Sequence, residues 1–156
     1  MVDDRAAEPT ATKVDFWLLT RDPVEKVTAM IAERVLRDGA RLLVMHGDPD
    51  ARQNLSRALW EHGGTSFLAN GEAQAPHAER QPILIGDACT AANGARQLVL
   101  ADGEWREEAL GFDRAFLLFG EGRREAARGV WKALEQRGNV ERSYYAQEGG
   151  RWVKKG

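Results

Sequence analysis

Short runs of mostly apolar residues alternate with amphipathic stretches along this chain. Such runs are typical of strands that helices cover on both faces, whereas apolar residues spaced three or four apart indicate a helix with one buried face. The runs that predict strands are 14–19, 41–46, 82–85, 97–100 and 115–119. Amphipathic stretches predict helices after the first, second and last of these runs, and 143–153 predicts an edge strand or a hairpin.

The first two predicted helices begin with the same pair of residue types. Asp22-Pro23 and Asp48-Pro49 each place a carboxylate at the N-cap and a proline at the first helical position. Glu25 completes a capping box with Asp22, and Asp38-Gly39 ends the first helix. The apolar positions that predict the buried faces are Val24, Val27, Ile31 and Val35 in the first helix, and Ala51, Leu55, Ala58 and Leu59 in the second.

The alternation of strands and helices predicts a single three-layer, Rossmann-like α/β domain with a mostly parallel sheet. At 156 residues and 43% hydrophobic content, the chain is long enough to bury one self-sufficient core. Residues 1–13 contain acidic residues, proline and threonine but no hydrophobic segment. We therefore expect a disordered N-terminal segment over 1–13 and one domain over 14–156.

A dinucleotide site in such a fold needs a glycine-rich turn between the first strand and the first helix. Here that turn reads Thr20-Arg21-Asp22-Pro23, with no glycine to let a phosphate approach the backbone. Asp22 also places a negative charge where the phosphate would lie. We therefore expect the fold without its phosphate loop and without a bound cofactor.

Candidate catalytic and metal-binding residues are few. His46 and Asp48 follow the second predicted strand, where catalytic groups can occur, so a small α/β enzyme or nucleotide-binding protein that uses them stays an alternative. Asp48 is better explained as the helix cap. His62 and His77 lack zinc-ligand spacing, and the single Cys89 excludes an internal disulfide. We expect no catalytic residue and no metal.

The overall charge argues against a protein that coats DNA. Lys and Arg number 22 against 24 Asp and Glu, a net charge of −2, so any role with nucleic acid is expected to be local or indirect. No apolar stretch approaches the roughly 20 residues that cross a bilayer. The expected location is the cytoplasm, which also suits a lone cysteine.

The last predicted helix carries a face of cations. At about 100° of rotation per residue, Arg124, Arg128, Trp131 and Lys132 fall within an arc of roughly 100°. The apolar residues on the other side of this helix are Ala126, Ala127, Val130, Ala133 and Leu134. Trp131 is therefore expected on the solvent side, and the face is expected to meet an anion.

An ordinary solvated face is the alternative for this helix. The acidic residues Glu121, Glu125 and Glu135 lie on or near the same surface, and Glu125 can pair with Arg128. Successive like charges one turn apart nevertheless cost an isolated helix about 0.2 to 0.5 kcal/mol per pair, and this cost suggests a use.

A second aromatic patch is expected around the end of the second helix. Trp60 is rotated away from the apolar face of that helix, and Phe67 and Leu68 follow shortly after. One interpretation is a contact with another protein, because aromatic residues dominate such interfaces. The other is a small cluster that packs the loop over 61–82 onto the sheet.

In their order and spacing, several segments resemble the family of the chi subunit of bacterial DNA polymerase III, which is part of its clamp-loader complex. The resemblance spans nearly the whole chain. The segments that carry it are Asp15-Phe16-Trp17-Leu18-Leu19, Gly39-Ala40-Arg41-Leu42-Leu43-Val44, Leu55-Ser56-Arg57-Ala58-Leu59-Trp60, Ser66-Phe67-Leu68 and Ala127-Arg128-Gly129-Val130-Trp131-Lys132.

The resemblance implies a non-catalytic subunit of a DNA polymerase holoenzyme. In the family, chi links the clamp loader to the acidic C-terminal tail of single-stranded DNA-binding protein (SSB), which ends in a Phe with its carboxylate. The tail site carried over to this chain consists of Arg124, Arg128, Trp131 and Lys132, with Trp131 where a Tyr is often found. DNA contact would then be indirect, through SSB, and the main alternative is direct binding of single-stranded DNA by the same residues.

The resemblance also implies a second contact, in which Trp60 and Phe67 touch a psi subunit or a helicase. The family pattern continues after the Phe and its neighbour with Pro-His, whereas this chain has Ala69-Asn70 after Leu68. A partner at Trp60, Phe67 and Leu68 is therefore expected, and its identity as a psi subunit stays open.

Overall fold

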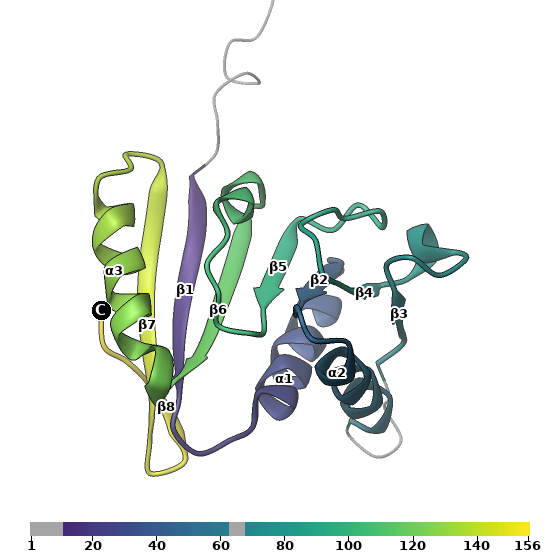
Figure 1. Ribbon diagram of the computed structural model, residues 1–156, viewed down its shortest axis with the longest axis horizontal. Coiled ribbons are helices and arrows are strands. Elements are labelled where there is room, and N and C mark those ends of the chain that lie inside the picture. Colours follow the sequence, from purple (N-terminus) through teal and green to yellow (C-terminus); the bar gives the residue numbers. More distant parts are fainter. Residues whose placement is uncertain (1–10, 63–67) are drawn as a thin grey trace, which may run out of the picture.

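The computed structural model describes residues 11–62 and 68–156, which form one mixed sheet with helices on both faces (Figure 1). The strands in this part of the chain lie in the order β3-β4-β2-β5-β6-β1-β7-β8. Their bounds are β1 Thr12–Leu19, β2 Leu42–Met45, β3 Asn70–Glu72, β4 Ile83–Gly86, β5 Gln97–Leu100, β6 Arg114–Gly120, β7 Val140–Glu148 and β8 Arg151–Lys154. The α-helices are α1 Val24–Arg37, α2 Pro49–Glu61 and α3 Arg124–Glu135, with short 3₁₀ helices η2 Ala78–Arg80, η3 Glu107–Gly111 and η4 Glu121–Arg123.

The neighbouring strands pair in parallel, except β7 and β8, which form an antiparallel hairpin. The predicted three-layer α/β fold with a mostly parallel sheet is thereby confirmed. The hairpin near the C-terminal end is also confirmed, although its first strand begins at Val140 and lies inside the sheet beside β1.

Two hydrophobic cores lie on opposite faces of the sheet. In β1, Phe16 and Leu18 point into the core beneath α3, whereas Trp17 and Leu19 pack against the core beneath α1 and α2. This alternation is the period-two pattern of a strand covered on both faces. Consequently α3 lies across the sheet from α1 and α2.

The N-terminal boundary differs from the expectation at its last residues. Thr12 and Lys13, assigned above to a disordered segment, belong to β1, and residues 1–10 lie outside the described part. The Thr12 hydroxyl donates to the carbonyl oxygens of Leu110 and Phe112, each at 3.0 Å. A buried hydroxyl with two acceptors explains why the strand begins before its first apolar residue.

Strand β3 was missed because it is short and polar. Its first residue, Asn70, is buried, and the amide oxygen accepts a hydrogen bond from the Ser56 hydroxyl on α2 at 2.6 Å. The Asn70 amide nitrogen donates to the carbonyl oxygen of Leu68 at 2.9 Å. Backbone pairing with β4 and these side-chain hydrogen bonds, not apolar periodicity, hold this edge strand.

One of the two predicted helix caps is correct. Asp48 is the N-cap of α2, and its carboxylate accepts a hydrogen bond from the Asp50 amide at 3.1 Å. The prediction for Asp22 is wrong, because α1 begins after Pro23 with no side-chain capping bond. The Asp22 carboxylate instead accepts from the Gln147 side-chain amide at 2.8 Å, which ties β7 to the turn before α1.

None of the helices in the described ranges is both long and apolar enough to span a lipid bilayer.

An ion pair with a buried carboxylate joins the neighbouring strands β1 and β6. Asp15 is fully buried, and the Arg114 guanidinium donates to its Oδ2 from Nε at 2.8 Å and from Nη2 at 2.5 Å. Removing one partner of such a pair leaves an uncompensated charge in the protein interior.

We predict that Arg114→Ala lowers the free energy of unfolding by about 3 kcal/mol, because it strands the Asp15 carboxylate. The matched control is Arg96→Ala, which removes an exposed pair with Asp113 (2.9 Å) and should cost less than about 1 kcal/mol. Urea denaturation of both variants measures the difference. Equal losses of unfolding free energy in the two variants would show that the Asp15–Arg114 pair stabilises the fold no more than an exposed ion pair does.

Candidate functional site

Helix α3 packs on the sheet through a narrower stripe than the sequence predicted. Ala127 and Leu134 are buried and Val130 is half-buried, whereas Ala126 and Ala133 are exposed. The helix thus rests on β1, β6 and β7 through one side only, and the rest of its circumference faces solvent.

Trp131 is half-buried, which corrects the expectation that it faces solvent. Its ring makes T-shaped contacts with Phe16, with centroids 5.2 Å apart, and with Tyr144 at 6.0 Å. The helical rotation places Trp131 only roughly 50° from the buried line through Ala127 and Leu134, so a ring of this size reaches the sheet. The indole therefore packs against the core on one side and lines the protein surface on the other.

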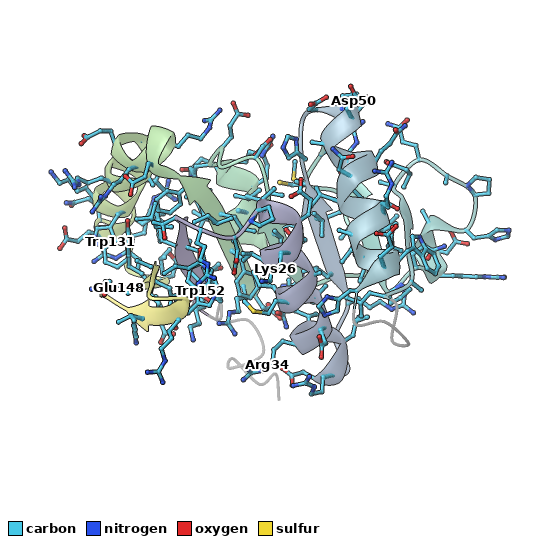
Figure 2. All side chains as sticks on the ribbon, turned by 90° about the horizontal axis from the view of Figure 1, so that it is seen from below. Lys26, Arg34, Asp50, Trp131, Glu148 and Trp152 are labelled. Atoms are coloured by element: carbon cyan, nitrogen blue, oxygen red, sulfur yellow. The ribbon has the colours of Figure 1, made fainter. Side chains whose placement is uncertain are left out.

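A groove of about 500 Å³ lies between α3 and the end of the β7–β8 hairpin. Apolar residues and cations share its lining. The residues that line it are Leu18, Arg124, Arg128, Trp131, Tyr144, Ala146, Lys155 and Gly156. In Figure 2, Trp131 and Glu148 lie on the same side of the molecule as this hairpin.

Each of the two arginines of the groove pairs with an exposed carboxylate. Arg124 pairs with Glu121 and Arg128 with Glu125, each at 3.4 Å and each one turn earlier in the chain. Exposed pairs of this kind contribute between about 0 and 1 kcal/mol, so an incoming anion can replace either carboxylate at little cost. The acidic residues that favoured an ordinary solvated face are thus weak partners.

Lys132 does not join the other three predicted residues. It is exposed and absent from the lining of the groove. On the helix it lies roughly 150° from the buried line, further round than Arg128. The structure therefore brings Arg124, Arg128 and Trp131 together and leaves Lys132 on the adjoining outer face.

Arg142 fixes the position of Trp131, a contact that was not predicted from the sequence. The Arg142 Nη1 donates to the Trp131 carbonyl oxygen at 2.7 Å, and the guanidinium lies 4.3 Å from the centre of the indole ring. This placement is that of a cation–π contact. The alternation of Arg142, Tyr144 and Ala146 on one face of β7 is the only pattern that could have indicated the wall opposite α3.

The second predicted patch is only partly described. Trp60, at the end of α2, is 44% exposed, and Phe67 lies outside the described residues. Leu68 is only 8% exposed and packs in the core beneath α1 and α2, which corrects the expectation of a contact surface there. Leu68 thus fits the alternative in which this segment packs onto the domain.

His46 and Asp48 serve the start of α2. The Asp48 amide donates to His46 Nδ1 at 3.0 Å, while the Asp48 carboxylate caps the helix. Residues 11–62 and 68–156 contain no group of three or more His, Cys, Asp or Glu side chains able to hold a metal ion.

A charged cluster that the sequence did not reveal lies beside this turn, at Asp102. Its carboxylate accepts from Arg106 at 2.8 Å and from the Gly47 amide at 3.1 Å. Burial raises the pKa of Asp102, but the hydrogen bonds from Arg106 and from the amides of Glu104 and Gly47 outweigh it and hold the pKa below its ordinary value. The cluster joins the ends of β2 and β5.

The fold and the groove define a Rossmann-like α/β protein. The carboxylate of Asp22 lies where a phosphate-binding loop would be, and a groove of cationic and aromatic residues lies beside α3. The model of the family described as "DNA polymerase III chi subunit, HolC" matches residues 11–141, and the chain belongs to this family. The predicted resemblance is confirmed, and with it an accessory role in DNA replication by DNA polymerase III.

Other comparisons add little. No curated protein matches the sequence. Among solved structures, the chain is similar to the C-terminal domain of a SWI2/SNF2 ATPase from Sulfolobus solfataricus, at 12% identity and a TM-score of 0.47. The match covers 72% of this chain and 57% of that one, and it is too distant to bear on function.

We predict that Asp102→Asn destabilises the protein by about 2 kcal/mol at pH 7, because it weakens charge-assisted hydrogen bonds. The folded pKa lies below the ordinary value of 3.8, so the contribution of Asp102 is complete above that value and is lost as the pH falls through the folded pKa. Denaturation at pH 7 and at about pH 2.5 should therefore show a difference that shrinks in acid. A difference that is independent of pH would contradict this assignment.

Proposed function

We propose that this protein connects the clamp-loader complex of DNA polymerase III to SSB by binding the acidic C-terminal tail of SSB in the groove beside α3. One observation carries the proposal: two arginines with exchangeable partners stand next to an apolar floor that is continuous with the core. Such a groove suits a short peptide that has both carboxylates and an apolar end. The family to which the chain belongs supports the choice of partner.

In this proposal the apolar residues of the groove bind the terminal side chain of the tail, and the arginines bind its carboxylates. Leu18, Ala146 and Trp131 supply apolar surface for the terminal Phe of the tail. Arg128 is proposed to bind the terminal carboxylate, because a guanidinium can donate two parallel hydrogen bonds to it. Arg124 attracts the aspartates upstream.

Lys132 has a different part in this proposal from the one its sequence position suggested. Since it lies outside the groove, we place it against acidic residues of the tail that have already left the floor. Its contribution should be screened by salt within a Debye length of about 10 Å at 0.1 M. Lys132 should therefore increase the association rate of the tail more than it slows dissociation.

The affinity for the tail should be modest, but its effect on the local concentration of the polymerase should be large. A short peptide on an open groove is expected to bind at about micromolar strength, and more weakly as salt rises. Tethering then raises the local concentration of the polymerase assembly at SSB-coated template, without any chemistry by this chain. An adaptor of this kind needs no active site.

The link to the clamp loader needs a second surface. Trp60 on α2 is our candidate, together with Phe67 beyond the described residues. The helices α2 and α3 pack on opposite faces of the sheet. They also lie at opposite ends of it (Figure 1), so both contacts can be made at once. The identity of this partner as a psi subunit is not part of the proposal.

Direct binding of single-stranded DNA is less well supported by the geometry. Base stacking needs an open aromatic face, whereas the Arg142 guanidinium lies over the Trp131 ring, 4.3 Å from its centre. The net charge of −2 also does not favour binding along a phosphate backbone. A carboxylate-bearing peptide fits the groove better.

We predict that Arg128→Glu weakens binding of a tail peptide at least about 30-fold, because it replaces a charge-assisted pair with repulsion. Arg137→Glu is the matched control: it makes the same charge change just after α3, at a residue that pairs with Glu107 and does not line the groove. Fluorescence anisotropy with a labelled peptide measures both. The proposal fails if the two variants bind alike.

We predict that Trp131→Ala abolishes tail binding and also lowers the free energy of unfolding by about 2 kcal/mol, because the half-buried ring packs on Phe16 and Tyr144. Trp131→Tyr keeps an aromatic ring at this position and should retain most of the binding. Peptide titration and thermal denaturation separate the two effects. Full tail binding by a folded Trp131→Ala variant would exclude the indole from the site.

A further inference from the structure

Half of the lining of the groove comes from the part of the chain that follows the family match. The match ends at residue 141, whereas the β7–β8 hairpin continues beyond it. The lining residues in this later part are Tyr144, Ala146, Lys155 and Gly156. The wall that faces α3 is thus built by residues to which the family assignment does not extend.

A bulge at the end of the hairpin places Lys155 in that wall. The Lys155 amide donates to the Tyr144 carbonyl oxygen at 2.6 Å, while the Tyr144 amide donates to the Gly156 carbonyl oxygen at 3.1 Å. Two residues of the outer strand therefore oppose one residue of β7. An arrangement of this kind is a β-bulge, which redirects side chains at the edge of a sheet.

Lys154 and Lys155 belong to opposite faces of the sheet. Lys154 pairs in register with Tyr145, whose ring packs with Trp17 at 5.2 Å on the face of α1. Lys155 is the next residue, so its side chain projects to the face of α3, and it lines the groove where Lys154 does not. Two adjacent lysines thus differ in their access to the site.

Lys155 is held by a replaceable partner, as Arg124 and Arg128 are. Its ammonium group pairs with the Glu148 carboxylate, and both side chains are about half exposed. Glu148 ends β7, directly before the turn of the hairpin. An exposed pair of this kind competes weakly with an incoming carboxylate.

We propose that Lys155 is a further carboxylate-binding residue of this groove and that Glu148 is the counter-ion which an acidic peptide displaces. The groove then has cations on both walls, with Arg124 and Arg128 on α3 and Lys155 on the hairpin. A peptide with carboxylates on two sides of its backbone would then contact both walls of the groove, and not α3 alone. This inference rests on the proposed function, because it assumes that an acidic peptide is the ligand.

The test compares charge reversals at the two neighbouring lysines, with the labelled tail peptide as the probe. Lys155→Glu should weaken binding about tenfold, roughly the size of one hydrogen bond between charged groups. Lys154→Glu changes the net charge by the same amount on the opposite face and should leave the affinity within about twofold. Circular dichroism confirms that both variants keep the fold.

A variant of opposite sign sharpens the test. Glu148→Gln removes the competing carboxylate and should tighten binding about threefold at low salt, the scale of an exposed ion pair. A merely structural role for the pair would weaken binding in this variant, because the hairpin would loosen. Tightening therefore supports a ligand-binding Lys155, and weakening overturns it.

Arg128→Glu in the same titrations separates this inference from the function on which it rests. If Arg128→Glu loses binding while Lys155→Glu and Lys154→Glu match each other, the groove binds the tail but Lys155 takes no part. If Arg128→Glu binds as well as the unaltered protein, the proposed function itself is wrong. Loss in Arg128→Glu and Lys155→Glu with none in Lys154→Glu is the result we expect.

Discussion

The contact of Trp131 with Phe16 and Tyr144 is the interaction on which the groove depends. These three rings join α3 and β7 to β1, which is distant from both in the sequence and lies beside β7 in the sheet. Because Trp131 makes T-shaped contacts with the other two rings and has Arg142 over its face, its position is set before any ligand arrives. Preorganisation of this kind reduces the entropy cost of binding.

The same fold shows how a Rossmann-like sheet can work without its usual ligand site. In this chain the turn after β1 carries Asp22, whose carboxylate binds Gln147 and so connects α1 to the C-terminal hairpin. The place of a phosphate is thereby used for a structural hydrogen bond. The proposed binding surface lies instead in the groove between α3 and the β7–β8 hairpin.

Local patterns explain what could be predicted from the sequence. The apolar runs and the Asp48-Pro49 helix start depend on neighbours in the chain, and the structure places them as expected. Arg124 and Arg128 were identified for the same reason, since helical rotation alone puts them on one face. The half-buried state of Trp131 was missed because a rotation angle gives a direction and does not show how far a large ring reaches.

What could not be predicted depends on strand order. Tyr144 and Lys155 line the groove, and Arg142 contacts Trp131, because β7 pairs with β1 and because a bulge follows β8. Neither the strand pairing nor the bulge can be read from the sequence. Asp22 failed as a cap for a related reason, since its partner Gln147 is distant in the sequence. The residues of the wall opposite α3 could therefore be identified only from the strand order in the structure.

The most direct measurement of the central claim is the capture of SSB by this protein, using intact SSB and SSB that lacks its acidic C-terminal tail, both bound to single-stranded DNA. The account predicts that the intact form is retained and that the tail-truncated form is lost. Equal retention of the two forms, or retention of the naked oligonucleotide, would contradict the account and indicate direct binding of single-stranded DNA.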